Sequence, residues 1–190
     1  MRHVRLDRRL VLILLGVVAI TVTADPALTL APAIAEARGG GTAAVGVFAS
    51  AFGIGAALGV VLMGLLERWF RLPQLVTAGL CVLGASTAAL AVPLPVAALV
   101  GAFAGAGAGM SVALTGLTAL LQVAVPDSLR GRVMSLWMAA FVGTRPFAAL
   151  LNGGLADAIS VPAALLVAAA LVAATAWACR PGRLHDASGA

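Results

Sequence analysis

Long apolar runs separated by short segments that carry arginine dominate the sequence. Six runs have roughly the length that crosses about 30 Å of hydrocarbon as a helix, and they occupy residues 10–35, 43–66, 75–92, 96–125, 132–156 and 163–179. Residues 1–9 form a basic N-terminal segment, and residues 180–190 form a short polar tail. The pattern predicts an all-α integral membrane protein with six transmembrane helices.

Two boundaries rest on individual residues rather than on hydropathy. Residues 72–126 carry no charge and are too long for one span. Pro93 and Pro95 divide them in two, because proline removes a backbone donor and disfavours helix before it.

The basic start and the apolar stretch 10–24 also fit a cleavable signal peptide. The apolar character continues well past Asp25, which favours an intact first span, although the sequence leaves cleavage open.

Composition supports the membrane assignment and excludes several classes of function. The 190 residues are 62% hydrophobic and 10% charged, whereas a soluble domain carries about 25% charged residues. The net charge of +5 comes from arginines dispersed between apolar runs, so no single basic face for nucleic acid is predicted. Neither histidine lies within a span, and no metal-ligand cluster occurs, so we expect no enzyme, no metal site and no cofactor. Cys81 and Cys179 are interpreted as small core residues.

The arginines predict the orientation of the chain. With the N-terminus in the cytoplasm, one arginine, Arg38, lies outside and Arg145 lies in the membrane. The cytoplasmic segments then hold the ten others: Arg2, Arg5, Arg8, Arg9, Arg68, Arg71, Arg130, Arg132, Arg180 and Arg183. This distribution agrees with the positive-inside rule. It predicts a multi-pass protein of the cell membrane with cytoplasmic N- and C-termini.

Polar residues within the spans are candidates for a solute path. Asp25 and Arg145 are charges at membrane depth, where a charge is costly and usually faces a cavity or a partner. We therefore expect these two residues to face each other or to share a polar cavity. The alternative for Asp25 is a position near the outer membrane interface, at the end of a shortened first helix. Trp137, Gln122 and Asn152 are further candidates to line the path, and core packing is the alternative for Trp137.

Glycines of the fourth predicted span form a regular stripe. Gly101, Gly105 and Gly109 recur every four residues and therefore share one helix face, which lets another helix approach closely. The stripe fits static packing, and it also fits a sliding contact in a transport cycle.

Two motifs resemble the major facilitator superfamily. The segment PDSLRGRVMSLWMAAF (126–141) resembles the cytoplasmic turn before the eleventh helix of that superfamily, and it is most similar to proton-coupled drug and siderophore exporters of the enterobactin-exporter type. The segment GLLERWFR (64–71) is similar to the superfamily's loop signature Gly-x-x-x-Asp-Arg-x-x-Arg, with a glutamate in place of the usual aspartate. The resemblance assigns a cytoplasmic loop motif to Gly64, Glu67, Arg68, Arg71, Asp127, Arg130, Gly131 and Arg132. Topology and lipid-headgroup contact are the alternative roles for these loops.

The resemblance covers nearly the whole chain and implies the C-terminal half of a major facilitator fold, built from two inverted three-helix repeats. Because the substrate of that superfamily binds between two halves, the resemblance implies proton-coupled export of a small apolar or amphipathic molecule by a homodimer or together with a separate N-terminal half. Residues 1–9 resemble the basic central loop of the family, which fits an internal start. An inactive truncated transporter and a non-transporting membrane scaffold are the alternatives.

Overall fold

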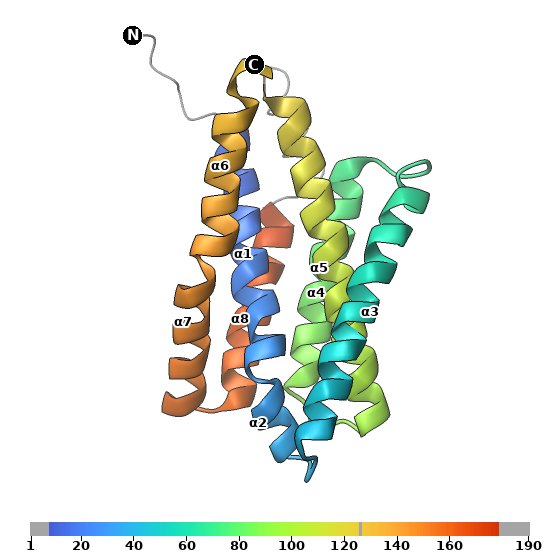
Figure 1. Cartoon of the computed structure of the whole chain (residues 1–190), viewed down its shortest axis with the longest axis vertical. Coiled ribbons are helices and arrows are strands. Elements are labelled where there is room, and N and C mark those ends of the chain that lie inside the picture. Colours follow the sequence, from blue (N-terminus) through green and yellow to red (C-terminus); the bar gives the residue numbers. More distant parts are fainter. Residues whose placement is uncertain (1–7, 126, 179–190) are drawn as a thin grey trace.

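The computed structural model describes residues 8–125 and 127–178, and this part of the chain folds into eight helices without a strand (Figure 1). They are α1 (Arg8–Thr29), α2 (Ala31–Glu36), α3 (Thr42–Leu66), α4 (Leu72–Leu90), α5 (Val96–Ala124), α6 (Asp127–Gly143), α7 (Arg145–Ala158) and α8 (Val161–Ala178). The predicted all-α class is confirmed. The tail 180–190, most of the segment 1–9 and Cys179 lie outside the described residues.

Five stretches of the described residues are long and apolar enough to cross a membrane. They are Thr42–Leu66, Leu72–Leu90, Val96–Val123, Arg130–Ala158 and Val161–Ala178, and Arg130–Ala158 combines α6 with α7. In α1, the shorter apolar helix Leu15–Thr29 accompanies them. The fold is therefore that of a multi-pass membrane protein, and a sixth complete span stays a prediction.

The first predicted span, residues 10–35, consists of two helices. α1 continues through Pro26 to Thr29, and the break falls at Leu30. Pro32 then occupies the first turn of α2, where its missing N–H leaves no hydrogen bond unmade. A proline in a membrane helix can be tolerated where neighbouring groups satisfy the backbone. The side chain of Asn152 is such a group, since it donates to the Val22 carbonyl.

The fifth predicted span consists of two helices, so the expectation of a continuous helix around Arg145 is corrected. α6 ends at Gly143, Thr144 is a turn, and α7 begins at Arg145. Pro146 explains the break, since it has no N–H to donate to the preceding turn, whereas it is tolerated in the first turn of the new helix. The Ala148 N–H donates to the Thr144 carbonyl at 2.8 Å and starts the new helix.

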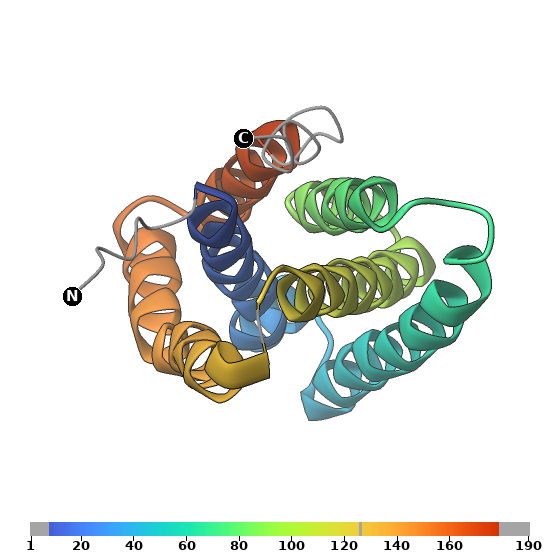
Figure 2. The same cartoon turned by 90° about the horizontal axis from the view of Figure 1, so that it is seen from above.

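The helices form two groups when the molecule is seen from above (Figure 2). α5 lies between α3 and α4, and it packs extensively against both. α1 lies between α8 and the α6–α7 pair and packs against all three. Contacts of α4 with α8 and of α1 with α5 join the two groups.

Glycines allow the close contact of α5 with α3. A Cβ atom built on Gly107 of α5 would overlap the backbone carbonyl of Phe52, and one built on Gly59 of α3 would lie 2.6 Å from the carbonyl oxygen of Ala108. Both obstructing atoms belong to the backbone, so they cannot rotate away. Beside these contacts, the rings of Phe48 and Phe103 stack with centroids 4.7 Å apart. The backbones of α3 and α5 are therefore so close at Gly59 and Gly107 that a side chain larger than hydrogen does not fit.

The predicted stripe Gly101, Gly105 and Gly109 serves a different neighbour over part of its length. A Cβ at Gly109 would lie 2.5 Å from the backbone nitrogen of Leu83 in α4, and one at Gly105 would lie 2.5 Å from the Ser86 hydroxyl oxygen. A Cβ at Gly101 would meet nothing within 4 Å. The stripe thus packs against α4 through two of its three members, while Gly107 faces α3.

Cys81 is exposed on α4, which corrects its interpretation as a core residue. The α4 face that carries it opens toward the surface of the bundle, and apolar character alone cannot separate a lipid-facing position from a buried one.

Candidate solute path

A groove of about 310 Å³ lies between α5 and α6. The α5 wall presents residues at helical spacing along one face, and the α6 wall presents one aromatic residue. The lining residues are Leu114, Thr115, Thr118, Ala119, Gln122 and Trp137. Two predicted path residues, Gln122 and Trp137, are therefore brought together. The Thr118 hydroxyl donates to the Leu114 carbonyl at 2.7 Å, so its oxygen remains available as an acceptor.

Trp137 combines burial with an unsatisfied donor. Its side chain is 9% exposed, and its indole Nε1–H is buried without a hydrogen-bond partner among the described residues. Leaving a buried donor unpaired costs about 1–3 kcal/mol. Such groups are uncommon in folded proteins, and each one calls for a specific explanation. The groove wall therefore holds a buried donor to which no group in the described part of the chain is bonded.

An aromatic stack connects Trp137 with Arg145. The rings of Trp137 and Phe141 stack at a centroid distance of 5.4 Å, and the Arg145 guanidinium carbon lies 5.5 Å from the centroid of Phe141. That distance is within the range of a cation–π interaction. The stack spans the interruption at Thr144, because two of its members belong to α6 and the third begins α7.

Phe141 was not among the predicted path residues. Its signal was nevertheless present, since Trp137, Phe141 and Arg145 follow one another at intervals of four and so share a helix face. Arg145 itself is exposed on the bundle rather than enclosed by it. The side chain of Asp25 lies outside the described residues, so the expected pairing of Asp25 with Arg145 stays a prediction.

Asn152 satisfies a backbone group that a proline has left open. Because Pro26 has no N–H, the carbonyl of Val22, four residues earlier, lacks its usual helical donor. The side-chain amide of Asn152 donates to this carbonyl at 3.1 Å from α7, and Asn152 is only 1% exposed. On α1, the neighbouring Thr23 hydroxyl donates to the Ala168 carbonyl of α8 at 3.1 Å. Asn152 thus ties α7 to α1 within one helical turn of Asp25.

The loop motif lies at one end of the bundle, where the α3–α4 and α5–α6 connections lie (Figure 1). A hollow of about 540 Å³ beside the first connection is lined by Glu67, Arg68, Trp69, Phe70, Arg71, Leu72, Pro73 and Leu120. The Arg71 backbone N–H donates to the Gln74 side-chain oxygen at 3.0 Å and so fixes the start of α4. A Cβ at Gly64 or Gly131 would meet nothing within 4 Å. Arg130 and Arg132 are exposed, and the side chain of Asp127 lies outside the described residues.

Metal chemistry finds no support in the described part of the chain. No group of three or more histidine, cysteine, aspartate or glutamate side chains comes together among residues 8–125 and 127–178 in a way that could hold a metal ion. The polar features of the path are instead hydroxyl, amide, indole and guanidinium groups, which bind solutes by hydrogen bonding and charge.

Comparison with known families identifies the chain more closely than its geometry does. A family model described as transmembrane secretion effector, of the major facilitator type, matches residues 1–188. A search of curated proteins found no significant match. The family match spans almost all of the 190 residues, and it agrees with the membrane-length helices. The chain therefore belongs to the transmembrane secretion effector family of major facilitator transporters.

Proposed function

We propose that the chain exports a small apolar or amphipathic molecule in exchange for protons. In this proposal it is the C-terminal six-helix half of a transporter of the enterobactin-exporter type. It completes its path either with a second copy of itself or with a separate N-terminal half. The description of the matching family as a secretion effector supports outward transport. The similarity of residues 126–141 to that exporter group supports the finer assignment.

The poorly covered α6–α7 face supports the need for a second half. In an apolar 18-residue window of Arg130–Ala158 only 11% is buried, compared with 28% to 44% in the corresponding windows of the other four membrane-length helices. Arg145 is exposed on this face near the middle of the stretch. An arginine at the centre of a bilayer costs at least about 2.5–3.5 kcal/mol. A partner or a water-filled cavity is therefore a better neighbour for this face than lipid.

The single observation that carries the proposal is the unpartnered indole N–H of Trp137 at the α5–α6 groove. Most ligand sites combine an apolar lining with a few placed polar groups, and this groove has that composition. A substrate with a hydrogen-bond acceptor on an apolar body would satisfy the indole donor once a helix movement uncovers it. Thr115, Thr118 and Gln122 would contact the remaining polar groups of the substrate.

Orientation and coupling complete the proposal. The arginine distribution favours cytoplasmic N- and C-termini in the cell membrane. We assign coupling or gating to Asp25 and Arg145. The motif residues of the two cytoplasmic loops then stabilise one state of the transport cycle, with Glu67 as the acidic member of the first loop.

Replacing Trp137 with phenylalanine is expected to separate transport from stability. The ring that stacks on Phe141 is retained and the N–H is lost. Efflux of a dye that carries a carbonyl acceptor should fall about fivefold, as expected for one hydrogen bond of about 1 kcal/mol. Efflux of a hydrocarbon dye of similar size should be unchanged. Thermal stability should stay level or rise, because the variant removes an unsatisfied buried donor. Proton-dependent efflux is measured in cells that lack their major exporters, with membrane insertion verified.

Met138→Ala is the matched control, because it removes a large exposed side chain from the next position of α6 and should leave both dyes unaffected. Equal efflux of both dyes by Trp137→Phe and the parent would contradict a ligand contact at the indole. Unchanged efflux by Arg145→Ala would contradict the coupling role of that residue. An inserted parent chain that moves neither dye would contradict the homodimer and favour a separate half or a scaffold.

A further inference from the structure

The exposed face of α6 and α7 carries a cation at membrane depth, Arg145. It lies fifteen residues after Arg130 and thirteen before Ala158, in the middle of the membrane-length stretch. Its side chain is exposed, and its guanidinium carbon lies 5.5 Å from the centroid of the Phe141 ring. A ring against the flat face of a guanidinium accepts no hydrogen bond from the five N–H donors at its edge. These donors need an oxygen acceptor, which lipid tails do not provide.

The side chains beside Arg145 on this surface are large, apolar and exposed. Val142 and Met138 lie one and two turns before it, and Phe147 and Leu150 follow it; all four are more than half exposed. Exposed apolar side chains alone would suit lipid, but a charge among them would not. The complement of this face is therefore an apolar surface that holds a single anionic group.

The acidic side chains that the structure describes lie too far away to supply this anion. Glu36 and Glu67 lie at opposite ends of the bundle (Figure 1). Asp157 lies on α7 itself, twelve residues beyond Arg145, which corresponds to about 18 Å along the helix.

The helix register also separates Arg145 from the backbone at Asp25. α1 and α7 run in the same direction (Figure 1), and the hydrogen bond from Asn152 to the Val22 carbonyl sets one against the other. Asp25 lies three residues beyond Val22, whereas Arg145 lies seven residues before Asn152. The two charged positions are therefore about 15 Å apart along the helices. The predicted pairing of Asp25 with Arg145 requires a different arrangement of α1 and α7.

The same face of a second copy would not complement Arg145. A two-fold dimer uses the same patch on both subunits. Such a contact through α6 and α7 would bring two Arg145 side chains together at the same depth. Like charges repel more strongly in a medium of low dielectric constant than in water. The charge therefore favours a partner helix of a different sequence.

We propose that the α6–α7 face binds a transmembrane helix of different sequence that carries one carboxylate level with Arg145. The carboxylate accepts two parallel N–H bonds from the guanidinium, and apolar residues around it pack against Met138, Val142 and Leu150. This inference rests on the proposed function, and it names the partner: the second half supplies this helix, and a second copy does not. The ion pair sets the depth at which the two halves meet.

Cross-linking to a synthetic helix tests the contact. The chain with Val142→Cys, Cys81→Ser and Cys179→Ser is placed in phosphatidylcholine vesicles under mildly alkaline conditions. The probe is a leucine–alanine helix of about 23 residues with a central glutamate and a cysteine one turn away. We expect half-maximal cross-linking at a peptide concentration about tenfold lower than for the same peptide with glutamine. Arg145→Gln should abolish this preference, and Arg145→Glu should transfer it to a peptide with a central arginine.

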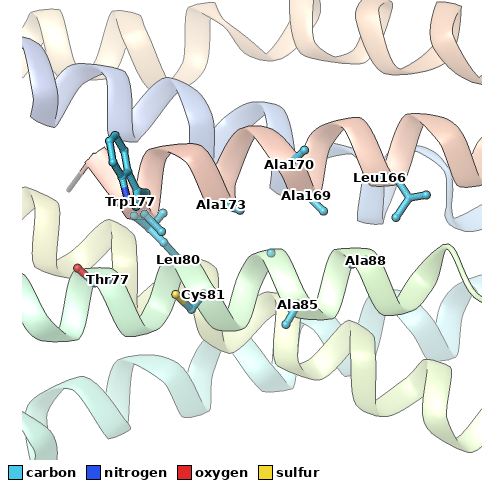
Figure 3. Close-up of a pocket in the computed structure, with 12 residues that line it drawn as sticks. Thr77, Leu80, Cys81, Ala85, Ala88, Leu166, Ala169, Ala170, Ala173 and Trp177 are labelled. Atoms are coloured by element: carbon cyan, nitrogen blue, oxygen red, sulfur yellow. The ribbon is translucent and has the colours of Figure 1, made fainter. Parts of the chain in front are cut away.

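The native Cys81 provides the matched control. It is exposed in a groove between α4 and α8, on a different side of the bundle from α6 (Figures 2 and 3). In a chain that keeps Val142 and carries Cys179→Ser, Cys81 should cross-link to the glutamate and glutamine peptides equally, and only at higher concentrations of either.

Three results would overturn the proposal. Equal cross-linking of the Val142→Cys chain to the two peptides would contradict the carboxylate. A glutamate preference that survives Arg145→Gln would contradict the role of the guanidinium. Cross-linking between two chains through Val142→Cys that exceeds cross-linking to the peptide would assign the face to a second copy. None of these measurements involves transport, so an inserted chain that exports neither dye would contradict the proposed function without changing their outcome.

Discussion

Gly107→Ala is expected to lower the thermal stability of the purified chain more than any other single methyl addition on α5. The new Cβ would overlap the Phe52 carbonyl and would lie 2.9 Å from the backbone nitrogen of Ala56. Overpacking a core usually costs about 1–3 kcal/mol, because side chains move aside. Here the obstacles are backbone atoms of α3, so the helices themselves have to separate. Gly107→Leu is expected to leave no folded monomer.

Gly101→Ala provides a control on the same helix with the opposite sign. A Cβ at Gly101 meets nothing within 4 Å, and alanine is about 1 kcal/mol better than glycine within a helix. Both variants are compared by the temperature at which half of the detergent-solubilised protein remains monodisperse on gel filtration. A decrease for Gly101→Ala as large as that for Gly107→Ala would contradict the packing described between α3 and α5.

Asn152→Ala is expected to destabilise the chain by about 1–2 kcal/mol, because it leaves the buried Val22 carbonyl without a donor. The size of the loss depends on Pro26, which is the reason that this carbonyl is open. In a Pro26→Ala background, the alanine N–H supplies the missing helical donor, and Asn152→Ala should then cost only a small fraction of that amount.

A double-mutant cycle measures this coupling. Stability is read from the parent, from each single variant and from the double variant in the same detergent. Equal costs of Asn152→Ala in both backgrounds would show that the asparagine acts elsewhere than at the proline. Leu151→Ala is a control on the same helix, since that neighbouring side chain is exposed and should give equal values in both backgrounds.

The sequence was most informative about the membrane-length helices and less informative about where single residues interrupt them. Hydropathy and the charged turns predicted membrane-length helices, because crossing a bilayer demands both length and internally satisfied backbone groups. Pro146 contained the information for the break at Thr144, whereas hydropathy predicted one continuous span over residues 132–156. The apolar character of Cys81 was read as burial, since a membrane protein is apolar both inside and on its lipid-facing surface.

The candidate path could be predicted only in part. Gln122 and Trp137 lie on different helices, and their shared groove depends on how α5 and α6 are placed. Phe141 could have been found from its spacing to Trp137 and Arg145. The hydrogen bond from Asn152 to the Val22 carbonyl could not have been predicted. Pro26 shows that this carbonyl lacks its helical donor, but the sequence does not indicate which helix supplies another donor.

The stack of Trp137, Phe141 and Arg145 crosses the interruption between α6 and α7. Any change in the angle at Thr144 has to shift the guanidinium relative to the ring of Phe141, because the two sit on opposite sides of the break. The Trp137 indole stacks on the same ring, so we expect its fluorescence to report that shift. With Trp69 and Trp177 replaced by phenylalanine, the fluorescence of Trp137 would report changes in the angle between α6 and α7 without an attached label.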